Sequence, residues 1–459
     1  MIYLVVLLGL GLRLISLNQS FWLDEATSAA AAGMGVKQIL SAFSLGDFHP
    51  PLYYLIIHFW GYLFGFSEVA IRMLSVLAGA GTLYVLYLIG KEVRDKKLGT
   101  IAALLLGTSG LHIYYSQEAR MYSLAALFVS LTFLFFVKTL KRGRVGEWLM
   151  FSFFLALSAF TDYLPILVIP GLWLFALSQK LNASWWKKFF TSHIILVGAG
   201  LLWLPYFLKQ LSAGLNVESH SPSWWQILGQ TNFKQLILIP TKFIFGKINM
   251  ELNLAQIMIV GVAFLVFGLL LFNSLKNRKV KPVWFWLIVP PVLASIISLR
   301  IPTLSYFRFL FILPAFYLLV GTGLLSLPKA RGKALMIAMV AFNLVTSSYY
   351  LFNYKNQRED WRALTGLIKN ESLGKSSVVI FVADSQQEAY RYYDKDAKIA
   401  THREIKGSEE ILWLMRYVQE IFDPEDRARL KVEELGYKKA QEYNFNGVVV
   451  WKYENENRN

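Results

Sequence analysis

The chain has 459 residues, of which 55% are hydrophobic and 17% are charged, and it carries a formal net charge of +16 without any cysteine. This apolar content exceeds that of a soluble domain of ordinary composition, so we expect a membrane protein. The absence of cysteine excludes disulfides, zinc–thiolate sites, iron–sulfur clusters and thiol nucleophiles, and leaves catalysis to oxygen, nitrogen or metal chemistry.

The apolar segments, taken in chain order, predict eleven membrane spans, because a helix of roughly 20 apolar residues crosses a bilayer core. They are residues 1–17, 70–90, 98–115, 120–137, 147–162, 163–179, 189–208, 254–273, 282–299, 306–327 and 334–351. The first segment lacks the charged leader and the small-residue cleavage site of a signal peptide. We interpret it as a retained span.

The charge of the connecting loops alternates along the chain. Five loops hold 18 Lys and Arg in 37 residues, namely 91–97, 138–144, 180–188, 274–281 and 328–333. The intervening loops hold 8 in 112 residues, namely 18–70, 116–120, 209–253 and 300–308. Lys and Arg accumulate on the cytoplasmic side, which predicts a multi-pass protein of the plasma membrane with a cytoplasmic N-terminus and an extracytoplasmic C-terminus. The basic excess is thereby explained as topology, and we expect no nucleic-acid partner.

Two further apolar stretches are not expected to span the membrane. Residues 49–65 open with two prolines and are interrupted by His58, and counting them as a span would invert every later basic loop. We expect them to lie along the outer interface, and we expect the same of the loop 210–253 with Trp224 and Trp225.

The expected fold class is an α-helical polytopic membrane domain, residues 1–351, with outer juxtamembrane helices, followed by a small extracytoplasmic α/β domain, residues 352–459. The tail is polar and charged with short apolar runs. Its patterns predict strands at 376–383 and 446–453 and amphipathic helices at 358–370 and 408–421.

Polar side chains gather on the predicted outer side of the spans. Because polar groups within or beside a span are energetically costly, such a gathering indicates a functional site. The candidates are Asp24, Glu25, His49, Glu118, Arg120, Tyr122, Asp162, Tyr163, Tyr306 and Arg308. No metal-binding spacing such as HExxH and no Gly-rich phosphate loop occurs, so ATP-driven chemistry is not expected. Glu118 and His49 remain the candidates for metal ligands.

Several candidates have a structural alternative. In the pair Asp24 and Glu25, one carboxylate can accept a proton while its neighbour orients it, but the same pair suits the first turn of a helix. Glu118 and Arg120 belong either to a site or to a self-satisfied ion pair at a helix junction. Asp162 is expected in water at a loop tip unless the turn folds inward.

Arg308 and His49 also have both a functional and a structural interpretation. Arg308 suits a phosphate, which a guanidinium binds through two hydrogen bonds, and it equally suits a lipid headgroup at the membrane surface. A histidine before two prolines, as at His49, is more often a loop residue than a ligand.

Five short motifs occur in a characteristic order and on one predicted side of the membrane. They are FWLDEATSA at 21–29, FHPPLYYLIIHFW at 48–60, YYSQEARMYSL at 114–124, YFRFLFILPAFYLL at 306–319 and EDWRAL at 359–364. Together they make the chain resemble, over residues 1–365, the GT-C-type membrane glycosyltransferases related to protein O-mannosyltransferases and aminoarabinose transferases.

The resemblance implies an inverting hexosyl- or pentosyltransferase that uses a polyprenyl-phosphate-linked sugar and a protein, lipid or glycan acceptor. It makes Asp24 the general base with Glu25 beside it. Donor phosphate contacts would come from Arg120, Arg308, Tyr306 and His49, and acceptor or metal contacts from Glu118, Tyr122, Asp162 and Tyr163. A divalent cation is the one cofactor it suggests. Relatives carry a His–Tyr pair where this chain has Asp162 and Tyr163, which puts a metal role of Asp162 in doubt.

Two other functions fit the pattern of spans and outer polar residues. A transporter would place ionisable groups near the bilayer midplane on broken helices, whereas the acids here are predicted at helix ends on one face. A polymerase or ligase of lipid-linked envelope glycans would also work at the outer face, and it differs by transferring a preassembled block rather than one sugar.

Overall fold

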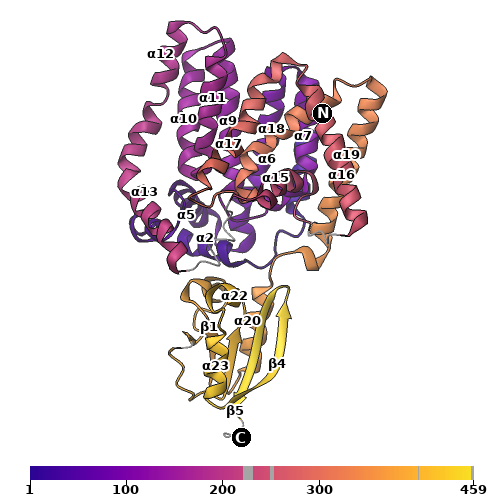
Figure 1. The fold of residues 1–459 in the computed structure, drawn as a ribbon. Helices are drawn as coiled ribbons and strands as arrows, with labels where there is room; N and C mark the ends of the chain where they lie inside the picture. The colour runs from indigo at the N-terminus through magenta and orange to yellow at the C-terminus, as the bar shows by residue number, and fades with distance from the viewer. Residues whose placement is uncertain (221–230, 249–252, 402, 456–459) are drawn as a thin grey trace.

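The computed structural model describes residues 1–220, 231–248, 253–401 and 403–455. In Figure 1 a bundle of long helices lies above a small domain built on a sheet, and the chain enters that domain after α19. We refer to residues 352–459 as the C-terminal domain.

The bundle and its connections consist of helices and short 3₁₀ or π turns (η). They are α1 (Ile2–Leu14), α2 (Leu23–Gly33), α3 (Val36–Gln38), η1 (Ile39–Phe43), α4 (Ser44–Gly46), α5 (Leu52–Phe64), α6 (Glu68–Val93), α7 (Lys96–Thr108), α8 (Gly110–Ser116), α9 (Tyr122–Lys141), α10 (Val145–Thr161), η2 (Leu164–Leu167), α11 (Val168–Leu177), α12 (Ala183–Thr191), α13 (Ile194–His220), α15 (Phe233–Phe245), α16 (Leu254–Ser274), η3 (Arg278–Val280), α17 (Lys281–Ile297), η4 (Tyr306–Ile312), α18 (Leu313–Leu324), α19 (Lys329–Phe352) and η5 (Tyr354–Asn356).

Each predicted span coincides with one or two helices of the bundle, which makes the chain a multi-pass membrane protein. Within the described residues, seven helices are long and apolar enough to cross a membrane, or eight when α7 and α8 count as one broken span. The helices α1, α10 and α11 are apolar but shorter, so the number of eleven stays a prediction. The stretch 49–65 forms the short helix α5, and Trp224 and Trp225 lie outside the described residues.

The break between α7 and α8 matters for the site because it redirects the chain by 67°. Ser109 at the break has an extended backbone, which frees carbonyl groups that a continuous helix would satisfy. Arg13 of α1 fills this need, since its guanidinium donates to the carbonyl of Gly107 at 3.2 Å and to the hydroxyl of Ser116 at 3.1 Å. The redirected helix α8 leads into the turn that carries Glu118.

The hairpin of α6 and α7 is closely packed, and glycine makes this possible. A Cβ atom on Gly90 would lie 2.4 Å from the Cα atom of Gly99, and one on Gly99 would lie 2.2 Å from the carbonyl oxygen of Tyr87. Because backbone atoms cannot move aside, any larger residue here would push the two helices apart.

The C-terminal domain is a five-stranded sheet in the order β2-β1-β3-β5-β4. Strand β1 pairs in parallel with β2 and β3, while β5 runs antiparallel to β3 and β4. Its elements are α20 (Trp361–Glu371), β1 (Ser377–Phe381), η6 (Asp384–Gln386), α21 (Glu388–Tyr393), β2 (Ile399–Thr401), β3 (Ile411–Met415), α22 (Gln419–Phe422), α23 (Arg427–Glu434), β4 (Tyr437–Phe445) and β5 (Val448–Asn455).

The strands predicted at 376–383 and 446–453 and the helix predicted at 358–370 are confirmed. The helix predicted at 408–421 is wrong, because residues Ile411–Met415 form the central strand β3 and only Gln419–Phe422 is helical. All five residues of β3 are buried, since helices cover both faces of the sheet. A strand buried on both faces has no alternating pattern, so its periodicity does not distinguish it from a helix.

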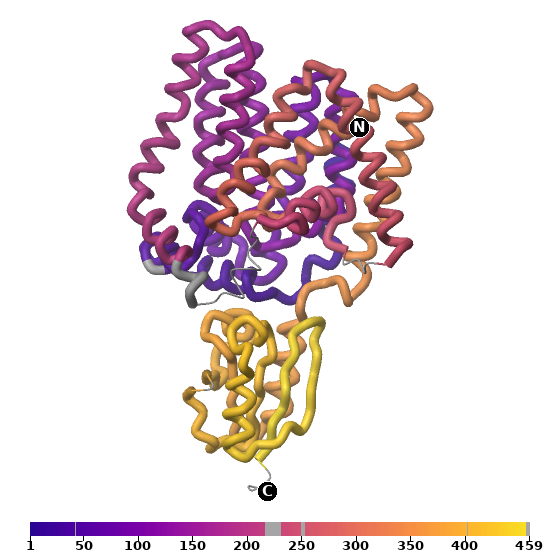
Figure 2. The backbone as a smooth tube through the Cα atoms, in the orientation of Figure 1, coloured from indigo at the N-terminus to yellow at the C-terminus, as the bar shows by residue number. Residues whose placement is uncertain are grey.

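The C-terminal domain sits at the end of the bundle where α2 and α5 lie, and helix α12 and the N-terminus lie toward the other end (Figures 1 and 2). Helix α21 makes the contact with α2. The hydroxyl of Tyr393 accepts a bond from the backbone N–H of Phe21 at 2.8 Å and donates to Glu68 at 2.8 Å, and Tyr392 donates to the carbonyl of Phe66. The domain is therefore tied to the outer loops of the bundle by directed hydrogen bonds.

Candidate active site

A cavity of about 340 Å³, which we call the polar cavity, opens where the bundle meets the C-terminal domain. Its lining comes from α2, α8 and the turn after it, the loop after α15, the start of η4 and the C-terminal domain. The lining residues are Trp22, Asp24, Tyr114, Tyr115, Glu118, Tyr122, Lys247, Tyr306, Phe307, Gln357, Arg358, Glu359 and Asn446.

Asp24 is the accessible carboxylate from the bundle in this cavity. It lies in the first turn of α2, where the helix dipole favours an anion, and its side chain is 41% exposed. Its Oδ2 lies 3.9 Å from Nη2 of Arg120, and Arg120 also donates weakly to Ser28 and Tyr54 at 3.5 and 3.4 Å. The carboxylate is thus oriented from one side and open to the cavity on the other.

Glu25, its neighbour, is fully buried and closed off. Its two oxygens accept bonds from Arg72 at 2.8 and 2.5 Å, one oxygen also accepts from the backbone N–H of Ala119 at 2.8 Å, and Nε of Arg358 lies 3.3 Å away. Although burial alone would raise the pKa of Glu25, Arg72 and Arg358 outweigh it and keep the pKa below its ordinary value. Glu25 is therefore a fixed anion that joins α2 to α6 and to the turn after α8.

Glu118 faces the cavity from the turn between α8 and α9. Its carboxylate lies 3.5 Å from Nη2 of Arg358. Burial raises the pKa of Glu118 to about 7, and the attraction of Arg358 only partly opposes this rise. The expected alternative of a self-satisfied pair with Arg120 is not what the chain adopts, because Glu118 pairs with Arg358 while Arg120 faces Asp24. Glu118 changes protonation near neutral pH.

Two further charged residues complete the polar cavity. Lys247 donates to the hydroxyl of Tyr306 at 3.1 Å and lies 5.0 Å from the ring centroid of Tyr114. Glu359 accepts bonds from the indole N–H of Trp361 and the hydroxyl of Tyr417, both at 2.9 Å. Burial raises the pKa of Glu359 above its ordinary value.

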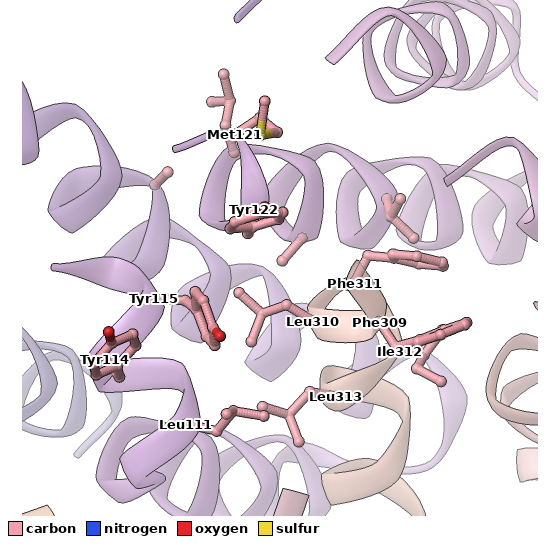
Figure 3. Packing of buried hydrophobic residues seen from close by; sticks show 14 of the residues in the cluster. Leu111, Tyr114, Tyr115, Met121, Tyr122, Phe309, Leu310, Phe311, Ile312 and Leu313 are labelled. Carbon is pink, nitrogen blue, oxygen red and sulfur yellow. The ribbon is translucent and has the colours of Figure 1, made fainter. Parts of the chain in front are cut away.

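The floor of the polar cavity is aromatic. Tyr115 and Tyr122 meet edge to face at 5.4 Å, and Phe307 lies 5.3 Å from Tyr122. In Figure 3 the side chain of Leu310 of η4 lies beside the side chains of Tyr115 and Tyr122. Aromatic faces next to hydrogen-bonding hydroxyls suit a ligand that has both apolar and polar surfaces, such as a sugar ring.

A second, mostly apolar cavity of about 330 Å³ lies on the other side of η4, and we call it the apolar groove. Its lining residues are Phe48, His49, Asp162, Tyr163, Leu164, Ile166, Leu167, Phe207, Gln210, Leu211, Gly214, Leu215, Ile297, Ile301, Pro302, Thr303 and Arg308. Tyr306 and Phe307 line the polar cavity while the next residue, Arg308, lines the groove. The first turn of η4 therefore contributes neighbouring residues to both cavities.

Several polar residues of the groove have partners within the chain. His49 pairs with Asp47 at 3.2 Å. Burial would raise the pKa of Asp47, but His49 together with Arg120 and Tyr54 outweighs burial and lowers it. The hydroxyl of Tyr163 donates to Gln210 at 2.5 Å. Asp162 is only 6% exposed, so the interpretation of a loop tip in water is wrong and the turn folds inward.

The sequence candidates thus divide by location. Asp24, Glu118, Tyr122 and Tyr306 meet in the polar cavity, and His49, Asp162, Tyr163 and Arg308 line the apolar groove. Arg120 is buried behind Asp24, and Glu25 is buried behind both. Because Glu118 and His49 line different cavities, they do not form one metal site, and within the described residues no three His, Asp or Glu side chains are grouped to hold a metal ion.

Sequence reasoning missed Lys247, Arg358 and Glu359 as members of the site. Lys247 stands alone after an apolar helix, with no local motif to distinguish it from the other lysines of its loop. Glu359 opens the motif EDWRAL, and this signal was available. Arg358 directly precedes that motif, in a segment that the pattern predicted as part of a soluble helix.

Comparison with known proteins gives the same picture. The family model described as dolichyl-phosphate-mannose-protein mannosyltransferase matches residues 48–208. No curated protein sequence matches the chain significantly.

Solved structures resemble nearly the whole chain. ArnT from Cupriavidus metallidurans bound to undecaprenyl phosphate has a TM-score of 0.61 at 11% identity, and the match covers 98% of this chain and 97% of ArnT. The oligosaccharyltransferase of Archaeoglobus fulgidus tethered to an acceptor peptide has a TM-score of 0.54 at 13% identity, over 95% of this chain and 67% of that one. The same archaeal enzyme, AglB, with an inhibitory peptide and a dolichol-phosphate has a TM-score of 0.52 at 11% identity, over 98% of this chain and 73% of that one. The resemblance inferred from the motifs is confirmed, and the chain has the fold of GT-C-type membrane glycosyltransferases.

Proposed function

We propose that this chain, which has the GT-C fold, transfers a glycosyl group from a polyprenyl-phosphate-linked sugar to an acceptor at the extracytoplasmic face, with inversion and with Asp24 as general base. The observation that carries the proposal is the pairing of two cavities. A polar, aromatic cavity with an accessible carboxylate and an apolar groove are both lined by residues of the first turn of η4.

A lipid-linked sugar has the chemistry to occupy both cavities. Its polyprenyl chain suits the apolar groove, and its sugar suits the aromatic floor of the polar cavity. The phosphate that joins them would then lie near η4, between Arg308 on the groove side and Lys247 with Tyr306 on the cavity side. The match of residues 48–208 to a mannosyltransferase family and the lipid phosphates bound by ArnT and AglB support this class of donor.

The reaction follows as a single displacement. Asp24 takes the proton of the acceptor hydroxyl as that oxygen forms a bond to the anomeric carbon. The bond from this carbon to the phosphate oxygen breaks at the same time, and its electrons leave with the lipid phosphate. Lys247 and Arg308 neutralise the charge that develops on the phosphate. One displacement inverts the anomeric centre.

The neighbouring residues have positioning roles in this proposal. Arg120 orients the carboxylate of Asp24, and the buried pair of Glu25 and Arg72 fixes the first turn of α2 from behind. Within the described residues no three His, Asp or Glu side chains are grouped to hold a metal ion, and the proposed steps use only side chains of the chain. The carboxyl groups of Glu118 and Glu359, which line the polar cavity, remain available to hold the hydroxyl or amine of the acceptor molecule.

The proposed orientation of the protein in the membrane rests on the charge of its loops. The N-terminus and the basic loop 180–188 next to α12 lie toward the end of the bundle that is remote from the C-terminal domain (Figure 1). Since basic loops favour the cytoplasm, we place both cavities and the C-terminal domain outside.

The experiment is transfer of radiolabelled sugar by the purified protein from polyprenyl-phosphate hexose and pentose donors to acceptors extracted from the same membranes. We expect transfer of single sugars with an inverted anomeric configuration, which NMR of the product reports. Retention of configuration would contradict the single displacement. Transfer of preassembled blocks would instead indicate a polymerase or ligase, and no transfer from any donor would count against the proposed class of reaction.

A further inference from the structure

Arg358 occupies an unusual position for a residue at the junction of two domains. It lies between η5 and α20, outside the membrane bundle in sequence, yet its side chain is buried and lines the polar cavity. Burying an arginine is costly unless it is paired and hydrogen-bonded, so its partners show what it is used for.

The partners of the Arg358 side chain come from three elements of the bundle. Nε lies 3.3 Å from Glu25 of α2, and Nη2 lies 3.5 Å from Glu118 in the turn after α8. Nη1 donates to the hydroxyl of Tyr350 of α19 at 3.0 Å, and the guanidinium lies 4.7 Å from the ring centroid of Tyr114. One cation therefore joins the helix that carries Asp24 to the turn that carries Glu118.

The backbone of Arg358 is held from both sides, because its N–H donates to the side chain of Gln19 of the bundle at 2.9 Å and its carbonyl accepts from the C-terminal domain. The side-chain amide of Asn446, in the turn between β4 and β5, donates to the carbonyls of Gln357 and Arg358, both at 2.9 Å. The backbone N–H of Asp360 donates to the carbonyl of Phe445 at 3.1 Å. The turn of this hairpin thus fixes where the Arg358 side chain enters the bundle.

We infer that Arg358 is a positioning residue of the active site, supplied by the junction with the C-terminal domain, and that docking of this domain is what completes the site. This inference rests on the proposed function. Without Arg358, Glu25 keeps Arg72 and the backbone N–H of Ala119, but Glu118 loses its ion-pair partner, and one of the contacts that hold α2 to the turn after α8 is lost. Asp24, one residue before Glu25, is then held less firmly in the cavity.

The test compares Arg358→Ala with Arg362→Ala in the full chain. Arg362 is the matched control, because it also joins the C-terminal domain to the bundle through Glu68 at 2.6 Å but lies outside both cavities. We expect kcat to fall on the order of 100-fold in Arg358→Ala, as misplacement of reacting groups by about 1 Å does. Arg362→Ala should stay within about threefold of wild type.

Two readouts separate positioning from general damage. Ethylguanidinium added to Arg358→Ala should restore part of kcat, because the small cation can enter the vacated space, and it should leave Arg362→Ala unchanged. The pH at which donor KM changes should also move upward in Arg358→Ala, since Glu118 loses a cation while Lys247, Glu25 and Asp24 still face it. Equal kcat in both variants, or a loss that neither ethylguanidinium nor pH affects, would overturn the inference.

A gentler variant covers the case in which Arg358→Ala does not fold. Asn446 has a positive φ of 53°, so Asn446→Gly keeps the turn and removes the side-chain bonds to the carbonyls of Tyr354, Gln357 and Arg358. We expect kcat to fall about tenfold with little change in donor KM. Wild-type kcat in Asn446→Gly would contradict the role of the hairpin. If wild-type protein transfers sugar and these variants behave alike, the inference fails while the proposed function stands; if wild type transfers nothing, the proposed function itself fails.

Discussion

Asp24 lines the polar cavity, and its Oδ2 lies 3.9 Å from Nη2 of Arg120. The two residues come from α2 and from the turn after α8, 96 positions apart along the chain. Arg120 is buried whereas Asp24 is open to the cavity. A buried cation next to an accessible carboxylate helps to keep that carboxylate pointed at the cavity, as a general base requires.

The first prediction concerns this pair. Arg120→Met should lower kcat by about 10- to 100-fold with little effect on donor KM, because it removes an interaction that orients the base rather than one that binds substrate. Steady-state kinetics with varied donor checks this. Arg300→Met, at an exposed position of the loop before η4, is the control and should behave like wild type.

The second prediction concerns pH. The pKa of Glu118 is raised to about 7, so its carboxyl gains a negative charge as the pH rises through neutrality. A negative charge there repels the donor phosphate, and donor KM should increase several-fold between about pH 6 and about pH 8. In Glu118→Gln this dependence should disappear, whereas a slope that is unchanged in this variant would assign it to another group.

The third prediction concerns the phosphate. Lys247→Met should raise donor KM and lower kcat together, because the cation binds the phosphate in the ground state and more strongly as charge develops. A loss of about 100-fold in kcat/KM is expected, since removal of one such group costs this order of magnitude. Lys234→Met changes an exposed lysine of the same helix region and should leave both parameters unchanged.

The fourth prediction concerns stability. Glu25→Gln leaves Arg72 and Arg358 buried without their shared anion, and we expect the free energy of unfolding to fall by about 3–5 kcal/mol. The pKa of Glu25 is lowered in the folded chain, so its contribution is present above the ordinary carboxyl pKa and is lost as the pH falls through the lowered value. Thermal unfolding in detergent should therefore show a difference between wild type and Glu25→Gln at neutral pH that shrinks in acid.

Its control is Glu434→Gln, which removes an exposed partner of Lys431 on α23. Exposed pairs contribute about 0–1 kcal/mol, so this variant should unfold near the wild-type temperature. Equal unfolding temperatures for wild type and Glu25→Gln at neutral pH would mean that the buried network does not hold α2.

The helical class of the fold was predictable because the predicted spans are long apolar segments, and each coincides with one or two helices. Strand β3 was not, because Ile411–Met415 is buried on both faces and lacks a period. The short helix α5 was separated from the spans by charge alternation rather than by hydropathy alone. The sequence pattern therefore predicted the elements that have one face in contact with solvent or lipid. It failed for strand β3, which is surrounded by protein on both faces.

The candidate site was predictable only in part, for a related reason. Asp24, Glu118 and Tyr306 were found because each stands beside an apolar run, where a polar group is conspicuous. Lys247 and Arg358 enter the cavity from segments that are polar or irregular, where one more charge carries no signal. The difference in role between Asp24 and Glu25 depends on Arg72, which lies 47 positions away from Glu25 and inside a helix. Only the folded chain reveals such partners.

The most direct test of the central claim is the rate of sugar transfer from a polyprenyl-phosphate donor by Asp24→Asn, with Asp396→Asn on the surface of the C-terminal domain as matched control. Asn has the same shape and cannot accept the proton, so we expect the folded Asp24→Asn protein to lose nearly all turnover while Asp396→Asn keeps it. Full turnover in folded Asp24→Asn would contradict the account, because the proton of the acceptor would then be taken by another group.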